Sequence, residues 1–137
     1  MLNFRGYISS RRFEDNNFVD QSVQNLVIRK ACEQHGFVYI LSATEYGMKS
    51  CYLMLNQVIL DLSKGKCDGI AFYSIEQLPK DLKLRNNIYQ VVNKYKKKIL
   101  ISLEDILIEH NKDIKSFENL IKIKFLLNFC PKNFKNK

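Results

Sequence analysis

The sequence lacks the spacing of a metal site. Its four cysteines include no C-x-x-C pair, and only two histidines are present to join them in a chain of 137 residues. Zinc sites are usually built from closely spaced cysteines and histidines, so the sequence predicts no metal site, and it gives no sign of a cofactor. Free thiols are typical of a protein in a reducing cytoplasm.

Long hydrophobic runs are also missing. The longest uncharged apolar stretch covers residues 37–44, far short of the roughly 20 residues that span a bilayer. Met1 leads directly to Arg5 and a strand-like segment, without the pattern of a signal peptide. We therefore expect a soluble cytoplasmic protein. Its length predicts a single domain over residues 1–128, followed by a basic tail over residues 129–137.

Acidic residues are scarce near the C-terminus. The net charge is +8, yet five lysines follow Glu118 with no acid among them. Another lysine cluster, residues 94–98, falls where a helix should end, and cations there complement the helix dipole. We therefore interpret the positive charge as solvated helix-end and tail charge, which makes a nucleic-acid partner unexpected, although the tail could contact RNA, DNA or acidic lipid.

Apolar runs alternate with helix-length segments along most of the chain. Strands are predicted over residues 2–8, 37–43, 69–74 and 98–103, with a short extra strand at 106–108 and a last helix after it. In the first helix, Val23, Val27 and Ala31 are expected to face inward. This alternation predicts an α/β fold: a central, mostly parallel sheet of four to five strands with helices on both faces, a three-layer sandwich.

In such a sheet the ligand crevice lies beyond the carboxyl ends of the strands. The segments expected there are residues 9–12, 44–50, 74–80 and 104–105, and all four are rich in polar groups. The fold prediction therefore places any chemistry in these four segments.

Two segments, GYISS at residues 6–10 and GIAFYSIEQLPK at residues 69–80, resemble the catalytic domain of serine recombinases, or resolvases. In that family the first strand ends in a Tyr-x-Arg-x-Ser pattern, whose serine attacks DNA. Tyr7 matches the pattern, but Ser9 stands at the arginine position and Arg11 at the serine position. The resemblance implies a resolvase-like fold with a misplaced nucleophile.

The second segment departs from the family in the same sense. The third strand of a serine recombinase ends in Leu-Asp-Arg-Leu-x-Arg, whose arginines hold the phosphate. Here Glu76 replaces the aspartate, Gln77 replaces the first arginine and Lys80 replaces the second. Phosphodiester displacement needs positioned cations against developing negative charge, so we expect no strand cleavage.

A second resemblance covers nearly the whole chain, at residues 4–11, 23–29, 41–46 and 51–55. These runs are similar to the bacterial sporadic carbohydrate cluster proteins, which are encoded among genes for surface-polysaccharide and nucleotide-sugar synthesis. The resemblance implies a pathway, and it carries no residue roles.

The strand ends supply the candidate binding residues. Backbone N–H groups, hydroxyls and guanidiniums there could grip a phosphate or a sugar carboxylate, although an ordinary hydroxyl-rich turn has the same composition. The predicted substrate-binding residues are Tyr7, Ser9, Ser10, Arg11, Arg12 and Gln77.

Four residues are the catalytic candidates. Glu45 and Glu76 follow two strands of the sheet and could divide the work of acid and base, or be solvated loop acids. Cys51 starts a helix, which lowers a thiol pKa, but it could equally be a core residue. Tyr73 is expected to lie half in the core and half in the crevice.

These features lead to three hypotheses. The first is a small enzyme, an isomerase, epimerase or lyase, that acts without a metal on a phosphorylated or nucleotide-activated sugar and forms a homodimer. The second is a non-catalytic subunit or adaptor of a carbohydrate-biosynthesis enzyme, which an exposed apolar face around Phe117 and Leu120 would favour. The third, a DNA-binding recombinase relative, is disfavoured by the missing arginines.

Overall fold

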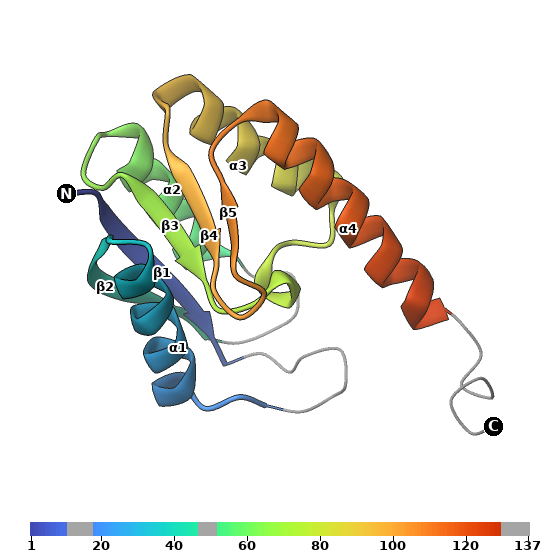
Figure 1. Ribbon diagram of the computed structural model, residues 1–137, viewed down its shortest axis with the longest axis horizontal. Coiled ribbons are helices and arrows are strands. Elements are labelled where there is room, and N and C mark those ends of the chain that lie inside the picture. Colours follow the sequence, from blue (N-terminus) through green and yellow to red (C-terminus); the bar gives the residue numbers. More distant parts are fainter. Residues whose placement is uncertain (11–17, 47–51, 130–137) are drawn as a thin grey trace.

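The computed structural model describes residues 1–10, 18–46 and 52–129, and it confirms the α/β prediction (Figure 1). A short 3-10 turn, η1 (Ile75–Gln77), follows the third strand. The elements in chain order are β1 (Asn3–Ser9), α1 (Gln21–Gln34), β2 (Val38–Glu45), α2 (Leu53–Ser63), β3 (Gly69–Phe72), η1, α3 (Leu82–Tyr95), β4 (Lys98–Ile101), β5 (Ile106–Ile108) and α4 (Asn111–Phe129).

The strands form one five-stranded sheet in the order β2-β1-β3-β4-β5. The first four strands are parallel, and β5 returns antiparallel to β4 through a tight turn. Parallel strands bring their carboxyl ends to the same edge. The ends of β1 to β4 therefore meet at one edge of the sheet, and the connections α2–β3 and α3–β4 meet at the opposite edge.

Helices cover both faces of the sheet. In Figure 1, α1 lies in front of the sheet and α2 and α3 lie behind it. One core cluster joins residues of α1 to the face that carries Phe4, Ile8 and Leu100. The other joins α2, α3 and α4 to the face that carries Tyr7, Ile70 and Phe72. The buried face of each strand therefore packs against a helix layer, as the predicted three-layer sandwich requires.

Two glycines in the strands are explained by packing. A Cβ added at Gly6 would lie 2.4 Å from the hydroxyl oxygen of Tyr39. A Cβ at Gly69 would lie 2.4 Å from the ring of Phe4 and 2.9 Å from the carbonyl oxygen of Lys98. Heavy atoms cannot approach so closely, so both positions admit only glycine without movement of their neighbours.

The inward face of α1 differs from the prediction. Val23 is 43% exposed, and Ala31 alone of the three expected residues is fully buried. The buried residues of the helix are Gln24, Ile28, Ala31 and Cys32. This set has the 3.6-residue spacing of one helix face, and it contains a buried amide that an apolar pattern does not reveal.

A charged cluster fastens α4 to α3. The guanidinium of Arg85 donates through Nε and Nη2 to the carboxylate of Glu118, both at 2.9 Å, and the hydroxyl of Tyr89 donates to the same carboxylate. Nη1 of Arg85 also donates to the carbonyls of Pro79 and Lys80. Such bidentate, charge-assisted bonds are among the strongest polar contacts in proteins. They lock the start of α3, the preceding loop and the middle of α4 together.

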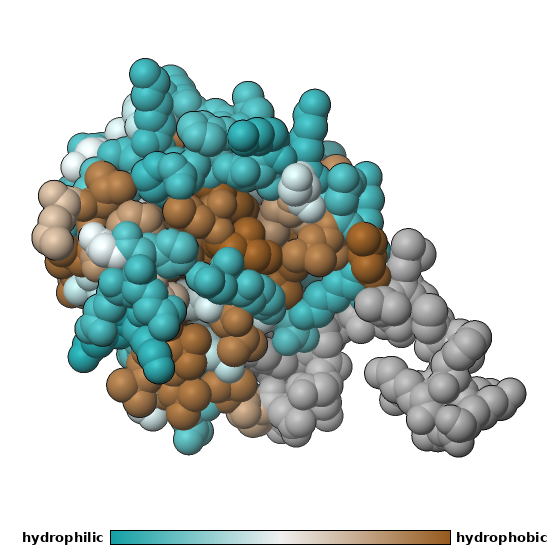
Figure 2. Space-filling model, viewed as in Figure 1, coloured by the Kyte–Doolittle hydropathy of each residue, from teal (hydrophilic) through white to brown (hydrophobic). Residues whose placement is uncertain are grey.

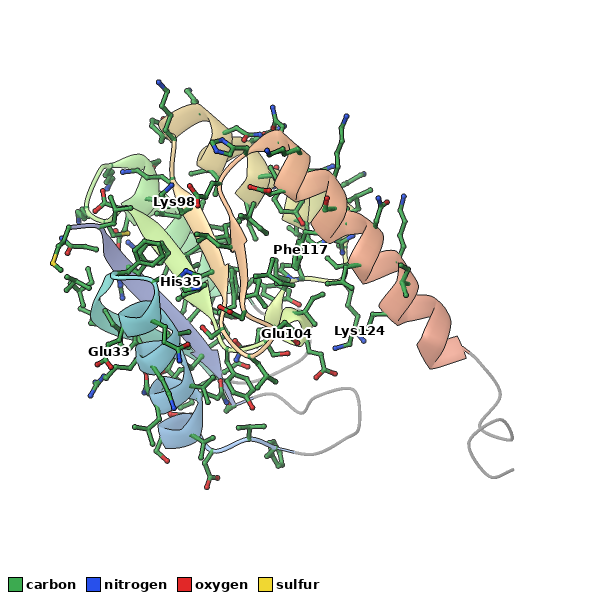
Figure 3. All side chains as sticks on the ribbon, viewed as in Figure 1. Glu33, His35, Lys98, Glu104, Phe117 and Lys124 are labelled. Atoms are coloured by element: carbon green, nitrogen blue, oxygen red, sulfur yellow. The ribbon has the colours of Figure 1, made fainter. Side chains whose placement is uncertain are left out.

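The inner face of α4 belongs to the core. Phe117 points from α4 toward the sheet in Figure 3, and its side chain is 2% exposed. Leu120 is 40% exposed, so the apolar face expected for an adaptor is covered in part. The tail at residues 130–137 lies outside the described residues, and its separation from the domain stays a prediction. Among the described helices, none is long and apolar enough to cross a membrane.

The Arg85–Glu118 pair predicts a specific acid dependence. Burial raises the pKa of Glu118, but the hydrogen bonds from Arg85 and Tyr89 outweigh this effect and hold the pKa below its ordinary value of 4.5. A lowered carboxyl pKa stabilises the fold above the unfolded-state value, and this stabilisation is lost as the pH falls through the folded-state pKa. We expect Glu118→Gln to lower the free energy of unfolding at pH 7 by about 2 kcal/mol or more.

Urea unfolding of wild type and Glu118→Gln at several pH values between 7 and 3 measures the effect. The stability gap between the two proteins should begin to narrow as the pH falls below about 4.5, where the unfolded carboxyl takes up a proton. It should close as the pH falls through the lower folded-state pKa, because both proteins then carry a neutral side chain at position 118. Glu33→Gln, an exposed change on α1, serves as the control and should parallel the wild type. A gap that stays constant down to pH 3 would contradict the role given to the carboxylate.

Candidate functional site

The carboxyl edge of the sheet brings together parts of all four predicted segments. Ser9 ends β1 and Ser10 follows it, Glu45 ends β2, and Tyr73 and Ser74 follow β3. Glu104 lies in the turn after β4, and Figure 3 places it at this edge and Lys98 at the opposite edge. The structure therefore places the polar residues where the fold prediction put them.

A buried chain of amide groups occupies the centre of this edge. The side chain of Gln24, fully buried, accepts from the backbone N–H of Ser9 at 3.1 Å and donates to the carbonyls of Ser9 at 2.9 Å and Val19 at 2.8 Å. Gln77 donates to Gln24 Oε1 at 2.6 Å and accepts from the backbone N–H of Tyr73 at 2.7 Å. We call Gln24 and Gln77, with the backbone groups they bind, the amide network.

The amide network is neutral and closed. Ser9 and Gln77 are only 2% and 3% exposed, so neither presents a side chain to a ligand in the crevice. Gln77 stands at the position of the first phosphate-holding arginine in the recombinase pattern, and Ser9 at that of another arginine. Where that pattern has two cations, this chain has uncharged groups that bind each other or the backbone.

Glu45 is bound to the start of α2. Its carboxylate accepts from the backbone N–H groups of Met54, at 3.0 and 3.1 Å, and Leu55, at 3.3 Å, and from the hydroxyl of Tyr7 at 3.1 Å. The first N–H groups of a helix have no partner within it, and a carboxylate there also complements the helix dipole. Glu45 is 2% exposed, so it acts as the cap that α2 obtains from no residue of its own.

The loop after β3 is arranged around Glu104. Its carboxylate accepts from the hydroxyl of Ser74 at 3.0 Å and the N–H of Ile75 at 3.2 Å. Burial raises the pKa of Tyr73, and the nearby charges of Glu104 and Glu76 raise it further, so its phenol stays protonated at neutral pH. The hydroxyl of Ser102, in the same turn as Glu104, is buried and makes no hydrogen bond among the described residues.

Glu76 has different surroundings from Glu45. It lines a small pocket between η1 and α4, together with Lys80, Lys124 and apolar side chains. Arg85 also lines this pocket, and its guanidinium is already bound to Glu118 and two carbonyls. Glu45 is held by the start of α2 and by Tyr7, whereas Glu76 lines this pocket, and their pairing as acid and base stays a prediction.

Some predicted site residues fall outside the described residues. Arg11, Arg12 and Cys51 are in this group, so their roles stay predictions. Ser10 is half-buried, and its hydroxyl donates to the backbone carbonyl of Glu45 at 3.4 Å. Within residues 1–10, 18–46 and 52–129, no cluster of three or more metal-ligating side chains occurs.

Two residues that organise the edge were not anticipated from the sequence. A shift of one residue in the predicted inner face of α1 replaces Val23 and Val27 by Gln24 and Ile28, and this alternative face would have revealed Gln24. Glu104 was recognised as a residue of the crevice, but its role in capping the loop after β3 depends on a turn geometry that no motif specifies. Both residues form hydrogen bonds with backbone groups at the crevice.

Solved structures of recombinase domains have the same fold. The N-terminal catalytic domain of TP901-1 integrase aligns with a TM-score of 0.64 at 16% identity, covering 92% of this chain and 96% of that domain. A resolvase family site-specific recombinase from Streptococcus pneumoniae aligns with a TM-score of 0.63 at 10% identity, covering 88% of this chain and 87% of that one. No protein-family model and no curated protein matches the sequence.

These findings correct the carbohydrate hypothesis. The expectation of a protein of polysaccharide or nucleotide-sugar biosynthesis, with a sugar substrate and with nucleic acid an unexpected partner, is wrong, because both structural neighbours are recombinase or integrase domains. Three of the runs behind that expectation fall largely in β1, α1 and β2, which are elements of the shared fold. The described part of the chain has the serine-recombinase (resolvase-like) fold.

Proposed function

We propose that this chain is a DNA-associated protein of the serine-recombinase fold that does not cut or join DNA. The fold supports DNA as the partner class, since the solved structures that share it are a site-specific recombinase and an integrase domain. The amide network supports the other part of the proposal, that the protein does not cut or join DNA. A protein of this kind would act by occupying or bridging DNA, or by holding other DNA-bound proteins.

Strand cleavage needs an exposed nucleophile and cations beside the phosphate. Ser9 is buried, and both of its backbone polar groups are bound by Gln24. Gln77 stands at the position of the family's first arginine, and its side-chain amide is hydrogen-bonded to Gln24 and to the backbone N–H of Tyr73. Opening this network to admit a phosphate would leave buried amides unpaired, at about 1 to 3 kcal/mol for each group.

Glu45, one of the two predicted acid–base residues, is also held inside the fold. A general acid or base must come within hydrogen-bond reach of its substrate. The carboxylate of Glu45 is instead held by two backbone N–H groups and the hydroxyl of Tyr7. We infer that Glu45 serves folding, and that Tyr7 and Gln77 have structural roles with it.

The structural role of Glu45 can be measured directly. Glu45→Gln replaces one acceptor oxygen by an NH₂ group that faces the N–H donors of α2, so we expect the free energy of unfolding to fall by about 1 to 3 kcal/mol. Chemical denaturation measures it, and the exposed Glu33→Gln should stay within about 0.5 kcal/mol of wild type. Equal stability of Glu45→Gln and wild type would refute the capping role.

The proposed function predicts DNA binding without cleavage. Fluorescence anisotropy with a labelled 30-base-pair duplex should show saturable binding that weakens as salt is raised. Incubation with supercoiled plasmid, followed by denaturing electrophoresis, should show neither a nick nor a covalent protein–DNA adduct. A covalent adduct would refute the non-cleaving half of the proposal, and absence of any duplex binding at 50 mM salt would refute the DNA-associated half.

A further inference from the structure

Five lysines lie together at the amino edge of the sheet, opposite the crevice. Lys64 and Lys66 lie in the α2–β3 connection, Lys94 lies in the last turn of α3, and Lys96 and Lys97 lie in the α3–β4 connection. We call these five residues the basic edge. Figure 2 shows hydrophilic side chains gathered along this end of the molecule, over the turns at the top of the view.

The sheet itself brings the two connections together. Gly69 of β3 pairs with Lys98 of β4, and the N–H of Lys98 donates to the carbonyl of Asp68 at 3.2 Å. The charge of Lys97 acts on the thiol of Cys67, whose pKa is raised chiefly by burial and lowered in part by nearby cations. Lysines that are about 30 residues apart in the chain therefore share one surface.

The acids at this edge pair with only one of the five lysines. Asp61 is bound to Arg5 at 2.7 Å and forms a longer ion pair, at 3.8 Å, with Lys66, whose side chain is 63% exposed. Asp68 accepts from the N–H of Asn3, and Glu109 is paired with Lys98 at 2.6 Å. In the described parts of the chain, Lys64, Lys94, Lys96 and Lys97 make no ion pair.

The backbone at Lys96 adds an independent observation. Lys96 follows the last turn of α3 with φ 55° and ψ 47°, the left-handed conformation in which glycine is strongly preferred. A favourable interaction with the helix dipole accounts for Lys94 in the last turn of α3, but it does not favour lysine over glycine at position 96 or place Lys64 and Lys66 beside it. Lysine stands where glycine would fit the backbone better.

We propose that the basic edge binds the phosphate backbone of nucleic acid, at the end of the fold opposite the recombinase crevice. This inference rests on the proposed function, and it names the surface through which that function is carried out. Clustered lysines, most of them without an acidic partner, neutralise phosphates and release counterions, and such contacts bind nucleic acid without reading its sequence. Binding to a lipid surface would require large exposed apolar side chains that can insert into it. Among the described residues near these turns, Tyr95 is the one large apolar side chain that is exposed, so nucleic acid is favoured over a membrane.

Two triple variants with the same change in net charge test the surface. The edge variant carries Lys64→Gln, Lys94→Gln and Lys96→Gly, and the control variant carries Lys30→Gln, Lys83→Gln and Lys122→Gln at exposed positions elsewhere. Anisotropy with the labelled 30-base-pair duplex at several salt concentrations is the measurement. We expect the edge variant to bind at least about tenfold more weakly, with a salt slope reduced by about 2 to 3, and the control to bind nearly as wild type.

The single variant Lys96→Gly separates binding from folding. Its melting temperature should rise, because glycine adopts the left-handed conformation without strain, while its affinity for the duplex falls. Weaker binding by a more stable protein cannot result from unfolding.

The outcomes distinguish this inference from the proposed function. Equal affinities of the edge and control variants, with duplex binding intact, would overturn the basic edge and leave the DNA-associated function standing. Wild type that binds vesicles of phosphatidylserine but no duplex would overturn both.

Discussion

The side chain of Gln24 is the contact on which the crevice depends. A fully buried amide must satisfy two donors and an acceptor inside the protein, and Gln24 does so with Ser9, Val19 and Gln77. In doing so it joins the end of β1, the approach to α1 and the turn after β3. Three segments that are distant in sequence are thus held at fixed positions by one side chain.

The two ends of the sheet differ in charge. The carboxyl edge, where a recombinase pattern would carry arginines, is occupied at its centre by neutral amides and by carboxylates that serve as caps, Glu45 for α2 and Glu104 for the loop after β3. The unpaired cations of the described chain gather in part at the amino edge. Under the proposed function, the phosphate backbone of DNA would therefore contact the amino edge of the sheet, opposite the crevice.

The sequence predicted the fold well because its signals are local. Apolar runs and intervening helices gave the strands, including the short one at 106–108, to within a few residues. The burial of Gln24 and Glu45 could not be predicted in the same way, since both depend on partners more than eight residues away. Glu45 was interpreted as a crevice acid because it ends a strand, yet its carboxylate turns toward the N–H groups of α2.

The two family resemblances differed in how well they predicted the protein, and the difference has a physical reason. The recombinase resemblance rested on the strand ends, where spacing determines which groups meet, and its fold is confirmed. The carbohydrate resemblance rested on runs along β1, α1 and β2, which specify packing more than chemistry, and the function drawn from it was wrong.

Amide hydrogen exchange at Ser9 and Tyr73 tests the amide network most directly. Both N–H groups donate to side chains of the network, whereas the N–H of Ile70 lies within β3 and reports opening of the sheet. The account predicts slow exchange at all three sites in wild type and, in Gln24→Met, exchange at Ser9 and Tyr73 that accelerates at least about tenfold more than at Ile70. Equal acceleration at the three sites, or fast exchange of Ser9 in wild type, would contradict a closed network at the crevice.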